Sequence, residues 1–276
     1  MPGRAAPLLL LAIPGAFFTA FFLAPMAVVV GASFTDRNGV PSLANYAHIL
    51  LDSYHWDVLL VTLRIATATT LICVLLGTPL AYYLVNGFRW QTERRICIIL
   101  VVLPLFTSNI VRSFGWMILL GRNGLVNNAL LEIGLVERPL RFLGTETGIL
   151  IGLVYILLPF IVLSVGNALA AVDLALEDAS ADLGATPAAT FRNVTVPLCL
   201  PGLMAGSIMV FTLAMSAYVT PALLSSGRVT VFPMLIFQQY STVFNVHYGG
   251  ALSVTLLVLT VILVGVANRL GEGPRL

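Results

Sequence analysis

The sequence predicts an all-α integral membrane protein with six transmembrane helices, and its composition and its apolar runs point to this class. Of the 276 residues, 59% are hydrophobic and only 9% are charged, and the mean hydropathy is +0.99. An ordinary soluble domain has about 25% charged residues. So few charges cannot cover a water-exposed surface, so lipid must cover most of the chain. The net charge of +2 gives no reason to expect nucleic acid.

Six apolar stretches are long enough for the roughly 20 residues that a membrane span requires. The run from Leu8 to Val30 is too long for the core of a signal peptide, and no small-residue cleavage site follows it. We therefore expect a retained first helix and a single transmembrane domain over 1–276. The predicted spans are 8–33, 58–86, 95–120, 147–170, 198–224 and 249–268.

The residues between the spans include few candidates for chemistry. All fourteen basic residues are Arg, and a phosphate-binding P-loop requires Lys, so we expect neither an ATP site nor a catalytic residue on this chain. Within the polar segment 34–57, His48, Asp52, His55 and Asp57 are close together in sequence. We expect no metal site there, because the segment reads as a solvated loop without Cys and without two His on one helix face.

Arginine placement favours cytoplasmic termini. That orientation puts seven Arg inside and five outside, with Arg64 and Arg112 inside spans. Cytoplasmic loops carry an excess of basic residues, so the difference points weakly to both termini in the cytoplasm. The inside group is Arg4, Arg89, Arg94, Arg95, Arg192, Arg269 and Arg275, and the outside group is Arg37, Arg122, Arg138, Arg141 and Arg228.

The polar loop 171–197, between the fourth and fifth spans, predicts two short helices joined by a glycine. Asp173 can cap a helix over 174–183, and Gly184 stands where a left-handed residue would end it. Thr186 can cap a second helix with Pro187 at its first position. We expect that helix to reach Val194 and to stop before Pro197, which gives a compact hairpin suited to docking on the cytoplasmic side.

This loop resembles the EAA motif of the permeases of ABC importers, in which a Glu-Ala-Ala triplet precedes a Gly and an Ile-x-Leu-Pro ending at fixed spacing. Asp178-Ala179-Ser180, Gly184 and Val194–Pro197 match that spacing. The departures are Asp for Glu, Ser for Ala, and Val for Ile and Leu, and Glu177 could supply the acid. The resemblance implies a type I ABC importer permease fold, in which a cytoplasmic coupling-helix loop contacts the ATPase through Glu177, Asp178, Ala179, Ser180, Gly184, Thr186, Pro187, Phe191 and Arg192.

Further segments are similar to the spermidine/putrescine branch of these permeases. They are TLRIA at 62–66, GTPLAYYL at 77–84, GWMILLGRNGLVNNAL at 115–130 and AYVTPALLSSGRVTVFPMLI at 217–236. The resemblance implies a multi-pass protein of the bacterial inner membrane that takes up polyamine or a similar small solute. It also implies three partners: an ATPase dimer that holds ATP and Mg, a second permease in a heterodimer rather than a homodimer, and an extracytoplasmic binding protein.

Residues of the third span are candidates for the translocation path. Arg112 follows Arg95 by seventeen residues, about 26 Å of continuous helix, so we expect it near the outer interface. It could line the path or snorkel to the interface. For Arg64 we favour snorkelling or pairing with a loop acid such as Asp57. The other path candidates are Ser108, Asn109, Trp116, Tyr155 and Tyr218, although aromatic packing between helices could equally explain the last three.

Three alternatives to this function have different sequence requirements. An ion-coupled secondary transporter usually has a carboxylate within the membrane and an inverted repeat, and the predicted spans contain neither. A related importer could instead carry another solute, such as a phosphonate or an amino acid. An intramembrane enzyme would need a nucleophile with its base or a set of metal ligands inside the spans, and no such set converges.

Overall fold

The computed structural model describes residues 5–87, 90–172 and 174–271, and it is helical apart from one isolated bridge between Thr35 and Pro41. The chain divides into two compact units. One holds the residues up to Asp57 together with Phe232–Leu259, and the other holds Val58–Val231 with the residues from Thr260 on. Two of the three boundaries fall inside long helices and the third falls at Phe232, and we describe each unit by itself.

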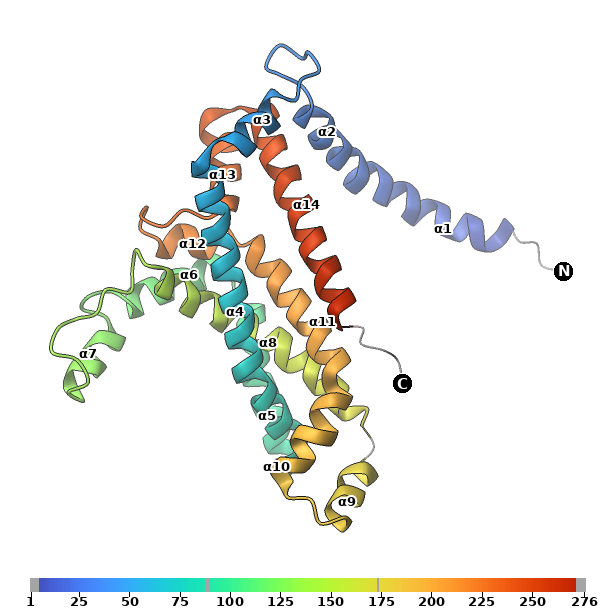
Figure 1. The fold of residues 1–276 in the computed structure, drawn as a ribbon, viewed down its shortest axis with the longest axis vertical. Coiled ribbons are helices and arrows are strands. Elements are labelled where there is room, and N and C mark those ends of the chain that lie inside the picture. The colour runs from blue at the N-terminus through green and yellow to red at the C-terminus, as the bar shows by residue number, and fades with distance from the viewer. Residues whose placement is uncertain (1–4, 88–89, 173, 272–276) are drawn as a thin grey trace. The chain divides into compact units, whose positions relative to one another are not determined.

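The unit that contains the N-terminal segment begins with a long helix interrupted by a π-turn (Figure 1). Its helices are α1 (Ala5–Phe18), η1 (Thr19–Leu23), α2 (Ala24–Ser33), α3 (Ala44–Leu51), α13 (Phe232–Gln238) and η4 (Gln239–Val243). It also contains the first residues of α4 (Ser53–Asn86) and most of α14 (Val246–Gly271). The segment 34–57, which we expected to be a solvated loop, therefore contains helix α3 and the beginning of α4.

The other unit is built around the packing of α8 (Glu146–Ala170) against α11 (Val196–Met215). A Cβ on Gly202 would lie 2.4 Å from Ala168 Cβ, so only glycine permits this approach, and the Ser164 hydroxyl donates to Gly202 O at 2.7 Å. Small residues allow such close contact between membrane helices. The remaining elements are α5 (Gln91–Val102), η2 (Leu103–Phe106), α6 (Asn109–Leu119), α7 (Leu125–Glu132), α9 (Leu174–Asp182), α10 (Pro187–Thr190), η3 (Phe191–Thr195) and α12 (Val219–Leu224).

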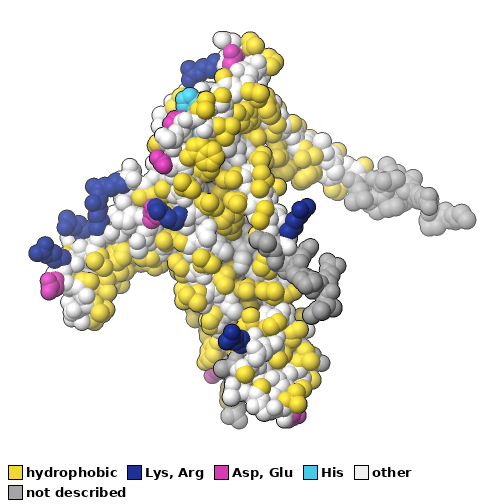
Figure 2. Space-filling model, viewed as in Figure 1, with side chains coloured by type: hydrophobic (Ala, Val, Ile, Leu, Met, Phe, Trp, Pro, Cys, Tyr) yellow, Lys and Arg dark blue, Asp and Glu magenta, His cyan; other side chains and the backbone are white. Residues whose placement is uncertain are grey.

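Five helices in the described part of the chain are long and apolar enough to cross a membrane, and a bent pair would make a sixth span. The five are Ala12–Ser33, Ser53–Asn86, Glu146–Ala170, Phe191–Met215 and Val246–Arg269. They correspond to five of the six predicted spans. Hydrophobic side chains cover the long helices on the face drawn in Figure 2, and many are fully accessible, such as Leu75 at 72%. This surface suits a lipid solvent.

The third predicted span, 95–120, is not one continuous helix. Gln91–Phe106 and Asn109–Leu119 meet at a bend of 102°. Pro104 lies in the short 3₁₀ turn η2, and Ser108 adopts an extended backbone, which ends one helix before the next begins. The 26 Å separation of Arg95 and Arg112 assumed a straight helix, so that argument for placing Arg112 at the outer interface is wrong.

The fifth span is shifted toward the N-terminus relative to the prediction of 198–224. Its helix runs over Phe191–Met215, and Ser216 ends it before α12 begins at Val219. The C-terminal part of the predicted span therefore forms a separate short helix. Ser113 in α6 and Thr220 in α12 join these two short helices through their hydroxyl oxygens, which are 3.0 Å apart and buried.

Candidate functional site

The first feature of interest is the hairpin of α9 and α10, which connects α8 to α11 along the chain (Figure 1). Helix α9 ends at Asp182, and Gly184 has a φ of +82°. The N–H of Ala185 donates to Ser180 O at 3.1 Å, which is the backbone bond of a Schellman C-cap. The predicted glycine elbow is confirmed, because this φ is left-handed and favours a residue without a Cβ. Asp173, the expected N-cap, lies outside the described residues.

The second helix of the hairpin begins as predicted. The Thr186 hydroxyl accepts from the N–H of Ala189 at 3.3 Å, which is a side-chain N-cap. The Ser180 and Thr190 hydroxyl oxygens are 2.9 Å apart and connect α9 to α10. Ser180, which we expected to contact the ATPase, therefore has a bond within the hairpin.

The expected stop before Pro197 is wrong. Helix α10 continues through the π-turn η3, Phe191–Thr195, into α11. Pro197 occupies one of the first two positions of α11, where the missing N–H is tolerated. The hairpin therefore joins the fifth span without a break in the helix.

Two sequence-predicted coupling residues at the end of α10 have different surroundings. The ring of Phe191 is half-buried and lies edge-on to Tyr82, with centroids 4.9 Å apart. Phe191 thus attaches the hairpin to α4 of the same unit, while the side chain of Arg192 is exposed. The partner contacts expected of both residues stay predictions, as do those of Glu177, Asp178 and Pro187, whose side chains lie outside the described set.

Two exposed leucines on the hairpin were missed by the sequence argument. Leu183 is 90% exposed and stands directly before the Gly184 elbow, and Leu176 in α9 is 47% exposed. Ala179 is exposed as well. The alternation of polar residues and leucines in α9 gave no reason to single these out, since leucines are usually buried. With Arg192, they give the hairpin an accessible apolar surface with a positive charge nearby.

The second feature is a cavity of about 500 Å³ between α6, α8, α11 and α12. Three of the predicted path residues line it: Asn109, Arg112 and Tyr218. Ser216 and Thr220 also line it, and the sequence argument missed them because the helix break at Ser216 was not predicted. No carboxylate occurs among the described residues that line the cavity, which are otherwise mostly apolar: Leu105, Leu153, Ile156, Leu157, Phe160, Leu213, Ala217 and Val219.

Arg112 is the charged group of this cavity. Its Nη2 donates to Asn109 Oδ1. Its Nε and Nη1 are buried and have no hydrogen-bond partner among the described residues. Buried donors without an acceptor are costly, so a rotation of this half-buried side chain that brought the two donors to an acceptor in the cavity would be favourable.

The remaining path candidates are arranged around Arg112 without lining the cavity. Trp116 and Tyr155 lie edge-on with ring centroids 5.3 Å apart, so α6 and α8 are joined by aromatic packing at that point. The carbonyl of Ser108 accepts from the N–H of Arg112 in the first turn of α6. The contact between the two rings agrees with the interpretation that Trp116 and Tyr155 pack helices together and do not line the path.

Arg64 pairs with an acid, but with a different one from the example given by the sequence argument. Its Nη2 contacts Glu146 Oε1 at the start of α8. Both side chains are accessible, 66% for Arg64 and 29% for Glu146. The ion pair joins α4 to α8 in a region outside the cavity.

Comparisons with known proteins agree with these features. Residues 73–270 match the family described as "Binding-protein-dependent transport system inner membrane component". The chain is 33% identical over 245 residues to the spermidine/putrescine transport system permease protein PotB of Salmonella typhimurium, covering 87% of this chain and 84% of the relative. It is 30% identical to the molybdenum transport system permease protein ModB of Mycobacterium bovis, covering 79% and 78%.

A solved structure shows the same fold. It is a bacterial ABC transporter involved in the import of the acidic polysaccharide alginate, matched with a TM-score of 0.83 at 17% identity, covering 97% of this chain and 95% of that one. The helical architecture is thus that of a type I ABC importer permease. The chain belongs to the family of inner membrane components of binding-protein-dependent transport systems.

Proposed function

We propose that this permease forms the path for a polyamine of the spermidine/putrescine type, or a similar small solute, across a bacterial inner membrane. The support for this solute is the 33% identity to a spermidine/putrescine permease over most of both chains. The cavity beside α6 offers the aromatic ring of Tyr218 and the hydroxyls of Ser216 and Thr220. Aromatic faces attract amino cations, so these groups suit one part of such a path.

The observation that carries the transport mechanism is the hairpin of α9 and α10. We propose that a separate ATPase dimer, which binds ATP and Mg, receives this hairpin in a groove. The left-handed Gly184, the Thr186 cap and the bond between Ser180 and Thr190 make the hairpin a compact element. The exposed Leu183 supplies apolar contact area. In this proposal the hairpin and both termini are on the cytoplasmic side, as the arginine distribution favours.

Two further partners belong to the proposal. An extracytoplasmic binding protein delivers the solute, as the family description implies. A second permease completes the path, and we propose a related chain in a heterodimer. The cavity beside α6 in this chain has a volume of about 500 Å³ and no carboxylate among its described lining residues. A polycation would need carboxylates somewhere on its path, and a different second chain could supply them.

One observation favours a second candidate, an importer of an anionic solute. Arg112, which lines the cavity, has two buried donors with no partner among the residues that the structure describes. Guanidinium groups pair well with oxyanions, and one relative is named as a molybdenum permease. A phosphonate or molybdate would therefore meet a suitable group here.

Uptake by proteoliposomes separates the two candidates. The permease is reconstituted with its ATPase, second permease and binding protein, and ATP-driven uptake of radiolabelled spermidine is compared with uptake of molybdate. We expect spermidine uptake, and we expect Arg112→Gln to leave its rate within about threefold. Anion uptake that disappears in Arg112→Gln, with no spermidine uptake by the unaltered protein, would establish the second candidate instead.

A further inference from the structure

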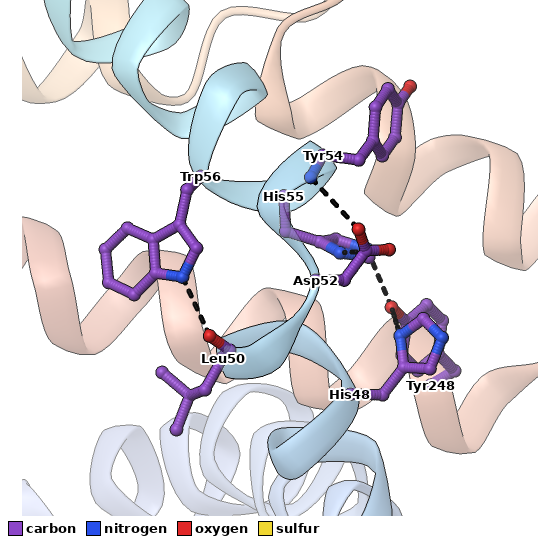
Figure 3. A network of polar contacts seen from close by, with 7 residues as sticks. All are labelled: His48, Leu50, Asp52, Tyr54, His55, Trp56 and Tyr248. Carbon is purple, nitrogen blue, oxygen red and sulfur yellow. Dashed lines mark hydrogen bonds and ion pairs between the residues drawn. The ribbon is translucent and has the colours of Figure 1, made fainter.

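The junction of α3 and α4 brings together three side chains that the transport function does not use. They are His48 in α3, Asp52 between the helices and His55 in the first turn of α4 (Figure 3). Each offers one ligand atom, and these atoms lie within 4.8 Å of one another. Tyr248, at the start of α14 in the same unit, points its hydroxyl at both histidines.

The carboxylate of Asp52 has two separate roles. Its Oδ1 accepts from the N–H of Tyr54 at 3.0 Å and so caps α4. Its Oδ2 lies 3.3 Å from His55 Nδ1. Zinc bonds of 2.0–2.2 Å to N and O in a tetrahedral site put neighbouring ligand atoms about 3.4 Å apart. The pair of Oδ2 and Nδ1 therefore already has the spacing of two zinc ligands.

His55 is arranged as a metal ligand with an outer-shell partner. The residue is only 7% exposed, and the one polar group placed beside its Nδ1 among the described residues is the Asp52 carboxylate at 3.3 Å. Its Nε2 lies 2.7 Å from the Tyr248 hydroxyl. A histidine that binds a metal through one ring nitrogen almost always donates from the other to a polar group. Tyr248 is in the position of that group.

His48 can supply the third ligand. Its side chain is exposed and can shift toward the other two, while its Nδ1 lies 3.1 Å from the same Tyr248 hydroxyl. A tyrosine oxygen has two lone pairs and so can accept from both imidazoles. The junction itself is fixed, because the indole N–H of Trp56 donates to Leu50 O at 2.9 Å.

We propose that His48, Asp52 and His55 bind one Zn²⁺ ion, with Tyr248 as a positioning residue and a water molecule as fourth ligand. Two imidazoles and one carboxylate suit zinc, whereas Mg²⁺ and Ca²⁺ prefer oxygen ligands. The objection from sequence was that these residues lie in a solvated loop, and it fails because two of them lie in helices and His55 is buried. In the proposed orientation, this site faces the exterior.

Direct binding measurements on the full chain test the proposal. The permease, purified with a tag free of histidine and incorporated in nanodiscs, is stripped with EDTA and titrated with ZnCl₂ by calorimetry. We expect one Zn²⁺ per chain. Titration with Co²⁺ should give the visible absorption bands of a four-coordinate site. A single site predicts one bound Zn²⁺ per chain. A stoichiometry below about 0.2 Zn²⁺ per chain would overturn the proposal.

Variants assign the ligands. His48→Gln changes an exposed side chain, so its fold is secure, and it should abolish the Co²⁺ bands, as should Asp52→Asn. Tyr248→Phe should keep binding but weaken it 10–100-fold, as loss of an outer-shell partner does. His247→Gln is the matched control, since His247 bonds instead to Thr35 Oγ1 at 2.8 Å and should leave binding unchanged. Binding that survives both His48→Gln and Asp52→Asn would show that the cluster only fastens the helices by hydrogen bonds.

Discussion

The coupling hairpin and the cavity beside α6 are assembled from opposite kinds of contact. The hairpin is closed by bonds between residues at most ten apart in sequence, such as Ser180 to Ala185 and Ser180 to Thr190. The cavity takes its walls from residues 105–220, which meet only when four helices pack. Local chemistry thus determines the hairpin, which we propose contacts the ATPase, and tertiary packing determines the cavity, which we propose contacts the solute.

Of the substitutions proposed here, one that strains the elbow of the hairpin should reduce transport the most. Gly184→Val places a β-branched residue at a φ of +82°, which costs about 1–2 kcal/mol for an L-residue. If docking requires this conformation, ATP-driven uptake should fall roughly five- to thirtyfold. Uptake and ATPase stimulation by the reconstituted complex measure this.

Gly134 provides the matched control for that prediction. It also has a left-handed φ, +71°, and open space around its Cα, but it follows α7, outside the hairpin. Gly134→Val should carry a similar conformational cost and leave uptake coupled to ATP. Equal loss of transport in both variants would mean that general destabilisation, rather than the geometry of the hairpin, explains the result.

Removal of an apolar side chain from the surface of the hairpin should weaken binding of the ATPase by an intermediate amount. Leu183→Ser removes a side chain that is 90% exposed in the isolated chain, so folding should be unaffected. If about half of the leucine is covered by the ATPase, the loss is about 1 kcal/mol, or roughly a fivefold weaker association. Surface plasmon resonance of the nanodisc-embedded permease with the ATPase checks it, and Leu135→Ser, another exposed leucine, should bind as the unaltered chain does.

Loss of the bond between Ser113 and Thr220 beside the cavity should have the smallest effect, although both residues are buried. Ser113→Ala removes the bond to Thr220, at an average cost of about 0.6 kcal/mol for such bonds between membrane helices. Unfolding in mixed micelles with increasing SDS measures this. Ser207→Ala is the control, because its hydroxyl bonds only within α11, to Leu203 O. If Ser113→Ala lowers the free energy of unfolding by more than about 2 kcal/mol, the packing around the cavity depends on this one bond far more than we expect.

The same contrast explains which features the sequence could predict. Glycine, threonine and proline in 184–187 predicted the elbow and the second cap because their conformational preferences act over a few residues. Five spans followed from hydropathy alone. The break at Ser108 was not predicted, because hydropathy continues across it and Pro104 by itself is compatible with a continuous, kinked membrane helix.

Sites formed across distant segments were predicted least well. Arg112 and Asn109 were singled out as path candidates, but Thr220 was not, since its position depends on where α11 ends. Tyr248 lies almost 200 residues from His55 in sequence, yet its hydroxyl is 2.7 Å from that imidazole. No spacing rule connects residues so far apart, so the cluster of His48, Asp52 and His55 seemed weaker in sequence than it is in space.

The unbroken helix from Phe191 to Met215 has a mechanical consequence. Its 25 residues span about 37 Å at 1.5 Å per residue, so one rod extends from the end of the hairpin to the level at which Ser216 bounds the cavity. A tilt imposed at one end displaces the other as far as the helix stays straight, and the π-turn at Phe191–Thr195 and Pro201 are the two places in it where a helix bends most easily. A stiffer π-turn at Phe191–Thr195 would transmit a larger fraction of any movement of the hairpin to the end of the helix beside the cavity.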